Sequence, residues 1–80
     1  MYKNKNGNSN NIAGKNIAKK RKSILPKMSQ RALADKLQLE GIDLDKNAIQ
    51  RIESGQRFVT DIELKAFASV LKMSIQELLI

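Results

Sequence analysis

The sequence contains no cysteine, no histidine and only one proline among its 80 residues. Without cysteine, the chain has neither a disulfide framework nor a thiolate metal site. Without histidine, it also lacks the usual general base and the commonest zinc ligand. The eight acidic residues are scattered and form no converging carboxylate pair, and we find no phosphate-cradling glycine loop or nucleophile motif. We therefore expect no enzyme activity, no catalytic residue, no metal ligand and no cofactor.

Long hydrophobic runs are also absent. No stretch approaches the roughly 20 apolar residues that a bilayer-spanning helix needs, and the Asn-rich N-terminus lacks the apolar segment of a signal peptide. We expect a cytoplasmic protein with no membrane contact, and no small-molecule ligand is evident. A hydrophobic content of 41% over this length suits one small globular domain.

Positive charge is concentrated in the first third of the chain. Fifteen Lys and Arg residues against eight Asp and Glu residues give a net charge of +7, and residues 1–28 contain eight of these cations and no acid. Charge of one sign at one end of a molecule favours an anionic partner such as nucleic acid. A biased nucleotide composition is the alternative origin of so many Lys and Asn residues.

The first ten residues are polar, and they show no apolar period that could support a packed element. They cannot bury enough surface to offset the entropy of ordering. We expect residues 1–10 to be a flexible basic tail rich in Asn and Lys, and residues 11–80 to form the domain.

Two helices are predicted in the first half of that domain. Ile12, Ile17 and Ile24 recur at helical spacing, and Pro26 disfavours helix in the residue before it, so the first helix should end near residues 23–25. The second helix should follow an N-cap and end where a left-handed residue is wanted. Its signals are the N-cap Ser29, the apolar residues Leu33, Ala34 and Leu37, and the terminal Gly41.

A connector and a third helix follow in the sequence. Ile42 and Leu44 should anchor the connector to the core, Asp45 is the expected N-cap, and Gly55 should end the helix. At 3.6 residues per turn, the apolar side chains of this helix fall in one sector and its polar side chains fall opposite. The opposite sector contains Asn47, Gln50, Arg51 and Ser54.

Capping boxes open two further helices. "TDIE" from Thr60 to Glu63 precedes an apolar period that continues to Leu71, and "SIQE" from Ser74 to Glu77 opens a short last helix. No alternating strand pattern or internal repeat occurs, so the predicted class is all-α with five helices. The last helix should expose more apolar side chains than it can hide: Ile75, Leu78, Leu79 and Ile80.

The order and spacing of the apolar, capping and polar residues along the predicted helices resemble those of the Cro and phage-repressor type, or XRE-type, helix-turn-helix proteins. The resemblance covers about residues 12–80 and implies a compact five-helix, lambda-repressor-like domain that binds duplex DNA, usually as a homodimer, with the third helix in the major groove. The matching residues are Ile17, Arg21, Ser29, Gln30, Leu33, Ala34, Leu37, Ile49, Ile52, Glu53, Gly55, Leu64, Ala68, Leu71, Ser74 and Leu78.

Candidate DNA contacts follow from the helix geometry and from the resemblance together. Arg and Lys pair well with guanine, and Asn and Gln with adenine, in the major groove. The residues expected to contact bases are Lys46, Asn47, Gln50 and Arg51. Gln30 lies in the first turn of its helix, where the dipole favours a phosphate. The resemblance implies phosphate contacts for Gln30, Gln56 and Arg57, and a structural ion pair between Arg21 and Glu53.

The sequence departs from the family pattern in two places. The segment between Arg21 and Gln30 is about two residues longer than is typical of the family, and "QLEGIDL" replaces a tight three-residue turn with an extended one.

The expected function is a sequence-specific DNA-binding regulator, most simply a small repressor of a phage, plasmid or mobile element, dimeric through its C-terminal helix. Alternatives are an antitoxin-like protein-binding module on the same fold and a nonspecific nucleoid-type DNA binder.

Overall fold

The computed structural model of the chain describes residues 11–24 and 28–79. Every regular element in these residues is a helix, in keeping with the predicted all-α class. The expected tail at residues 1–10, together with Pro26 and Ile80, lies outside the described residues. The five helices are α1 (Gly14–Ser23), α2 (Gln30–Leu39), α3 (Lys46–Glu53), α4 (Asp61–Leu71) and α5 (Ile75–Leu78).

The first two helices have the ends that the sequence indicates. Helix α1 begins after Ile12 and ends at Ser23, within the predicted range. The Ser29 side chain accepts a hydrogen bond from the Ala32 backbone N–H at 3.0 Å, so Ser29 is the N-cap of α2. Gly41, just beyond α2, has a φ of +83°, the left-handed conformation that glycine adopts at least cost.

Helix α3 is short but fixed at both ends. Asp45 caps its N-terminus by accepting from the Ala48 backbone N–H at 2.8 Å. At its C-terminus, the N–H of Gly55 donates to the Ile52 carbonyl at 3.1 Å, and the N–H of Gln56 donates to the Arg51 carbonyl at 2.8 Å. These two bonds form a Schellman motif, which satisfies carbonyls that the helix itself leaves free.

Both predicted capping boxes are present. Thr60 and Glu63 exchange reciprocal hydrogen bonds at the start of α4, as do Ser74 and Glu77 at the start of α5. The left-handed residue that ends α4 is Lys72, with a φ of 56°. No glycine marks this position, so the left-handed conformation could not be predicted from the sequence.

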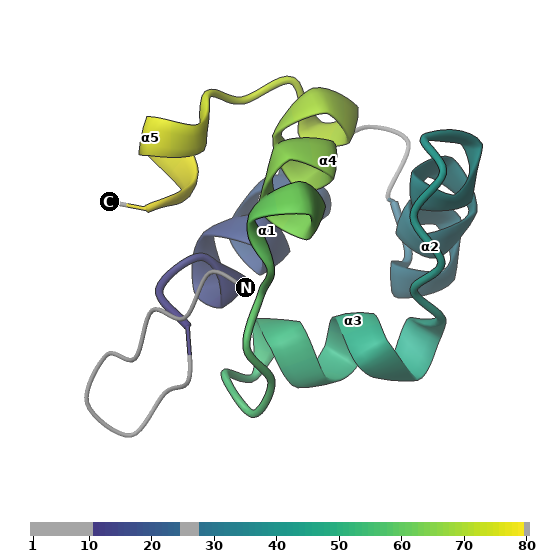
Figure 1. Cartoon of the computed structure of the whole chain (residues 1–80), viewed down its shortest axis with the longest axis horizontal. Helices are drawn as coiled ribbons and strands as arrows, with labels where there is room; N and C mark the ends of the chain where they lie inside the picture. The colour runs from purple at the N-terminus through teal and green to yellow at the C-terminus, as the bar shows by residue number, and fades with distance from the viewer. Residues whose placement is uncertain (1–10, 25–27, 80) are drawn as a thin grey trace.

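The core lies between the helices, and α3 forms one edge of the molecule. Figure 1 shows α1, α2 and α4 on one side of α3, with no described helix on its other side. Burial of each large aliphatic side chain contributes about 1.5–3 kcal/mol to this packing. The largest fully buried side chains are Phe67, Ile17, Leu33, Leu37, Ile49, Ile52, Leu71, Leu78 and Val59.

The expectation that α5 exposes its apolar residues is wrong for Leu78. Leu78 is fully buried, and Leu79 is half-buried against the core. The Asn16 side chain also donates to the Leu78 carbonyl at 2.8 Å, which ties α5 to α1. Ile75 alone of the described residues named in that expectation is exposed, at 41%. This short helix buries its apolar side because it packs against both α1 and α4.

Candidate nucleic-acid interface

Helix α3 presents a polar face away from the core, which we call the reading face. Its members are the four side chains that the sequence assigns to base contact, and all are exposed: Lys46, Asn47, Gln50 and Arg51. Ile49 and Ile52 on the opposite side are fully buried and hold the helix in place. Within the described part of the chain, no hydrogen bond or ion pair engages these four side chains, so their donors and acceptors point to solvent.

A buried polar network fixes α3 against the first two helices. Arg21 donates through Nε to Glu53 Oε2 at 2.7 Å and through Nη2 to Oε1 at 3.0 Å, and its Nη1 donates to the Met28 carbonyl at 3.0 Å. Each side chain of the Arg21–Glu53 pair is only 8% exposed. Bidentate charge-assisted bonds of this kind define an orientation as well as an attraction. The last turn of α3 is therefore locked to α1.

Gln30 belongs to the same network. Its Nε2 donates to Glu53 Oε1 at 2.9 Å, so the amide that the sequence assigns to a phosphate is directed toward the end of α3. Its backbone N–H lies in the first turn of α2, where the helix dipole attracts anions. A phosphate contact by Gln30 stays a prediction, and the backbone N–H is the group best placed to make it.

The loop after α3 contains the other two expected phosphate contacts. Gln56 is exposed. Arg57, in contrast, forms a bidentate pair with Glu63, with Nη1 2.9 Å from Oε1 and Nη2 3.0 Å from Oε2. The Arg57 Nη1 also donates to the Phe58 carbonyl at 3.1 Å. The guanidinium is thus held by the protein itself, on a loop at the edge of the reading face.

The ion pair shifts the pKa of both partners. The hydrogen bond to Glu63 raises the pKa of Arg57 further above its already high value, against the opposing effect of burial. Burial of the Glu63 carboxyl acts to raise its pKa, but the bonds from Arg57 and Thr60 and the nearby positive charge outweigh it and lower the pKa overall. Both groups are charged at neutral pH.

Asn11 is a structural residue of this site that the sequence did not reveal. It is 3% exposed, and its Nδ2 donates to the Ile52 carbonyl at 3.0 Å and to the Arg57 carbonyl at 2.7 Å. Its Oδ1 accepts from the Gly14 N–H at 2.6 Å. One amide therefore joins the start of α1, the end of α3 and the loop. The N-cap position of α1 belongs to Ala13, so no capping signal in the sequence pointed to Asn11.

Gly14 permits this close approach of α1 to α3. A Cβ atom at Gly14 would overlap the Ile52 carbonyl oxygen and would lie 2.7 Å from Asn11 Oδ1. The N-terminus of α1 therefore packs on the backbone at the C-terminus of α3. A side chain there would push the two helices apart and tilt the reading face.

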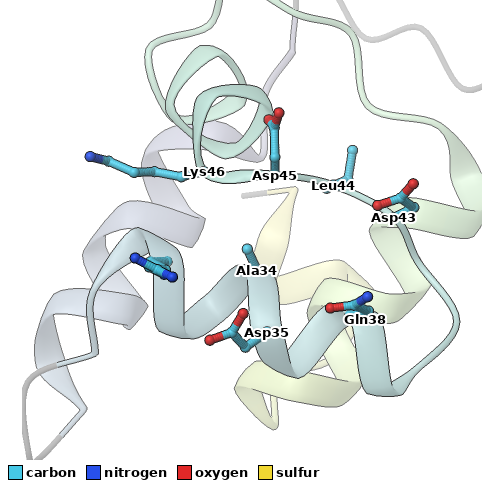
Figure 2. A pocket seen from close by; sticks show the side chains of 8 residues that line it. Ala34, Asp35, Gln38, Asp43, Leu44, Asp45 and Lys46 are labelled. Atoms are coloured by element: carbon cyan, nitrogen blue, oxygen red, sulfur yellow. The ribbon is translucent and has the colours of Figure 1, made fainter.

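The extended turn opens a hollow between α2 and the start of α3. Leu44 is buried and Ile42 is half-buried against the core, as the sequence predicts, so the connector is anchored. Figure 2 shows connector residues along one side of the hollow and α2 residues along the other. The hollow is lined by Arg31, Ala34, Asp35, Gln38, Asp43, Leu44, Asp45 and Lys46. Its charged side chains are three carboxylates and two cations, so the hollow is not a basic patch.

The helix-turn-helix region has no net positive charge that could attract nucleic acid. Residues 28–60 contain five Lys or Arg and five Asp or Glu residues, so this region is neutral. Its acidic residues do not gather into a group that could hold a metal ion anywhere in the described ranges. None of the helices in those ranges is long and apolar enough to cross a membrane. Any nucleic-acid contact by α3 must therefore depend on individual side chains.

Helices α2 and α3, joined by a connector and locked to a common core with an exposed polar face on the second, define a helix-turn-helix domain. A family model for this class, described as Helix-turn-helix, matches residues 17–78, and the chain belongs to that family, which is of the Cro/C1 type. The match confirms the XRE-type resemblance. The family consists of DNA-binding transcription regulators and is generally non-enzymatic, and the protein is a member of that class. Comparisons with curated proteins and with solved structures give no match.

Proposed function

We propose that the protein is a sequence-specific repressor that binds duplex DNA as a homodimer and blocks transcription by covering its operator. The reading face carries this proposal, because its four side chains are exposed, engage no described residue and are of the types that pair with bases. A rigid helix that presents unsatisfied donors and acceptors is suited to the major groove, where base edges offer complementary groups.

Backbone contacts would position the domain on the duplex. We assign this role to the first turn of α2 at Gln30, and to Gln56 and Arg57 in the loop after α3. Phosphate contacts set register and orientation but carry no sequence information. The Arg21–Glu53 pair contacts no DNA in this proposal, and it keeps α3 at a fixed angle to the groups that do.

Titration of duplex DNA tests the proposal. Sites recovered by selection from random duplexes should bind more tightly than scrambled duplexes of equal length and composition. Affinity should fall with salt, with a log–log slope of roughly −0.9 for each phosphate neutralised. Salt-independent or undetectable binding would contradict the proposal, and equal affinity for selected and scrambled duplexes would favour nonspecific nucleoid-type binding.

A protein-binding role has one observation in its favour. Leu39 at the end of α2 is 87% exposed and Ile62 in α4 is 67% exposed. Ile62 borders a hollow that also includes Ile42 and Ala66. Contiguous apolar surface is a feature of protein interfaces, and the hollow beside Ile62 is where such surface occurs. If binding to a protein partner is the main function, replacing Leu39 and Ile62 by Ser should abolish regulation while leaving duplex affinity unchanged.

A further inference from the structure

The ion pair between Arg57 and Glu63 lies where the loop after α3 meets the start of α4. We infer that Glu63 is a positioning residue for DNA binding: it orients the Arg57 guanidinium and masks its charge, which limits sequence-independent attraction to phosphates. This inference rests on the proposed function. It goes beyond it by assigning a role in specificity to a carboxylate outside the helix-turn-helix.

The loop presents Arg57 in a fixed place. The Arg57 carbonyl accepts from Asn11 at 2.7 Å, and the Arg57 N–H donates to the Arg51 carbonyl at 3.3 Å. The side chain is held by Glu63 and by the Phe58 carbonyl. Backbone and side chain are thus both restrained, so a contact with DNA would require little further ordering of this residue.

Glu63 is the better buried partner of the pair. Its side chain is 13% exposed, whereas that of Arg57 is 34% exposed. Glu63 Oε1 also accepts from the Thr60 backbone N–H at 3.0 Å, so the carboxylate is fixed to the first turn of α4. The more exposed Arg57 is therefore oriented by a carboxylate that is itself bonded to the backbone of α4's N-cap.

The geometry leaves part of the guanidinium free to bind. An arginine has five N–H donors, and three are used in the bonds from Nη1 and Nη2 to Glu63 and Phe58. The remaining Nη2 hydrogen and the Nε hydrogen are available for a phosphate oxygen. Because the Glu63 charge cancels that of Arg57, such a contact would orient the duplex while adding little to counterion release.

This masking matters because the rest of the helix-turn-helix region has no excess of positive charge: apart from Arg57, residues 28–60 contain four cations and five anions. Unmasking one cation at the backbone-contacting loop would strengthen binding to any duplex, but a selected duplex already receives a phosphate contact from the oriented guanidinium. The gain would be proportionally greater for scrambled duplexes, which depend on electrostatic attraction alone. Glu63 would thus lower the affinity for nonspecific duplexes and so raise the ratio of specific to nonspecific affinity.

The chain contains a matched control for the test. Glu63 and Glu77 each occupy the same position in a capping box, and each box is complete. Replacement by Gln preserves a capping-box side chain and raises the net charge by one in both cases. Only Glu63 holds an arginine; Glu77 lies near Lys20 without a bond to it. Comparing Glu63→Gln with Glu77→Gln therefore isolates the release of Arg57.

Affinities for selected and scrambled duplexes should be measured over a range of salt concentrations, after denaturant unfolding has shown that both variants are folded. We expect the log–log slope of Glu63→Gln to be steeper than that of Glu77→Gln by roughly 0.9, the contribution of one phosphate. We also expect Glu63→Gln to have a several-fold lower ratio of specific to scrambled affinity. In an Arg57→Gln background, Glu63→Gln should have the same slope as Glu77→Gln in that background.

Three outcomes would overturn the inference. Equal slopes for the two single variants would mean that Glu63 only caps α4, as would an effect of Glu63→Gln that persists without Arg57. A shallower slope for Glu63→Gln would mean that the pair must stay intact for Arg57 to reach DNA. These results leave the proposed function intact. Absence of salt-dependent duplex binding by the unaltered protein would overturn the proposed function and this inference together.

Discussion

Arg21 and Glu53 meet across the junction of α1 and α3, with Nε 2.7 Å from Oε2, and each side chain is 8% exposed. Removing one partner of a buried ion pair leaves the other charge uncompensated. We expect Glu53→Ala to lower the free energy of unfolding by about 3–5 kcal/mol. Denaturant unfolding measures this loss. A change within about 0.5 kcal/mol, the size usual for surface sites, would show that the pair contributes no stability.

The Asn11 amide should contribute to the stability of the fold. Asn11→Ala removes its bonds to the carbonyls of Ile52 and Arg57 and the bond that its Oδ1 accepts from the Gly14 N–H; the Ile52 carbonyl keeps the bond from Gly55, whereas the Gly14 N–H and the Arg57 carbonyl lose these partners. The expected cost in unfolding free energy is about 1–3 kcal/mol. Asn47→Ala is the control, because Asn47 is exposed on α3 and its loss should change stability by no more than about 0.5 kcal/mol. Equal stability of the two variants would contradict the role of Asn11.

The stability that Glu63 contributes should depend on pH. Its pKa in the folded protein is lowered, so the carboxylate stabilises the fold above the unfolded-state pKa, and this contribution is lost as pH falls through the folded-state pKa. We therefore expect the difference in unfolding free energy between the unaltered protein and Glu63→Gln to be constant near neutral pH and to shrink below about pH 4. Unfolding at several pH values measures it. A difference that grows on acidification would contradict the sign.

The sequence was most informative where local chemistry determines structure. Asp45 and Gly55 bound α3, Ser29 caps α2, and both capping boxes are present, because each depends on residues only a few positions apart. The buried side of α3 also followed from its period. These are local rules, and tertiary packing did not override them.

What the sequence could not show depends on contacts between distant residues. Asn11 reaches residues 41 and 46 positions away, and no local pattern identifies such partners. Similarly, the burial of Leu78 depends on the packing of α5 against α1 and α4. Arg57 was expected to contact phosphate because of its position after α3, but its pairing with Glu63 depends on the path of the loop. The sequence shows what chemistry each side chain can perform, but it does not show which distant residue that side chain contacts.

Dimer formation should appear in the footprint on DNA. Two-fold dimers of this class contact half-sites about 34–36 Å apart, and the protected sequence is an approximate palindrome. The sequence predicts that α5 forms the dimer contact. Ile75 is the large apolar residue of α5 that is exposed and could make this contact. Ile75→Ser should therefore weaken cooperative occupancy of two half-sites more than binding to one. Protection of a single half-site by the unaltered protein would contradict a dimer.

Sequence reading by α3 is the central claim, and the affinity of Arg51→Ala for selected and scrambled duplexes tests it most directly. Arg31→Ala is the matched control, because it removes an exposed arginine of equal charge from the first turn of α2. Arg31→Ala should weaken both duplexes alike. Arg51→Ala should cost about 1–3 kcal/mol on the selected duplex, cost less on the scrambled one, and relax the preference at one base pair. If Arg51→Ala lowers the affinities for the selected and the scrambled duplex equally, α3 contacts phosphates and does not read bases.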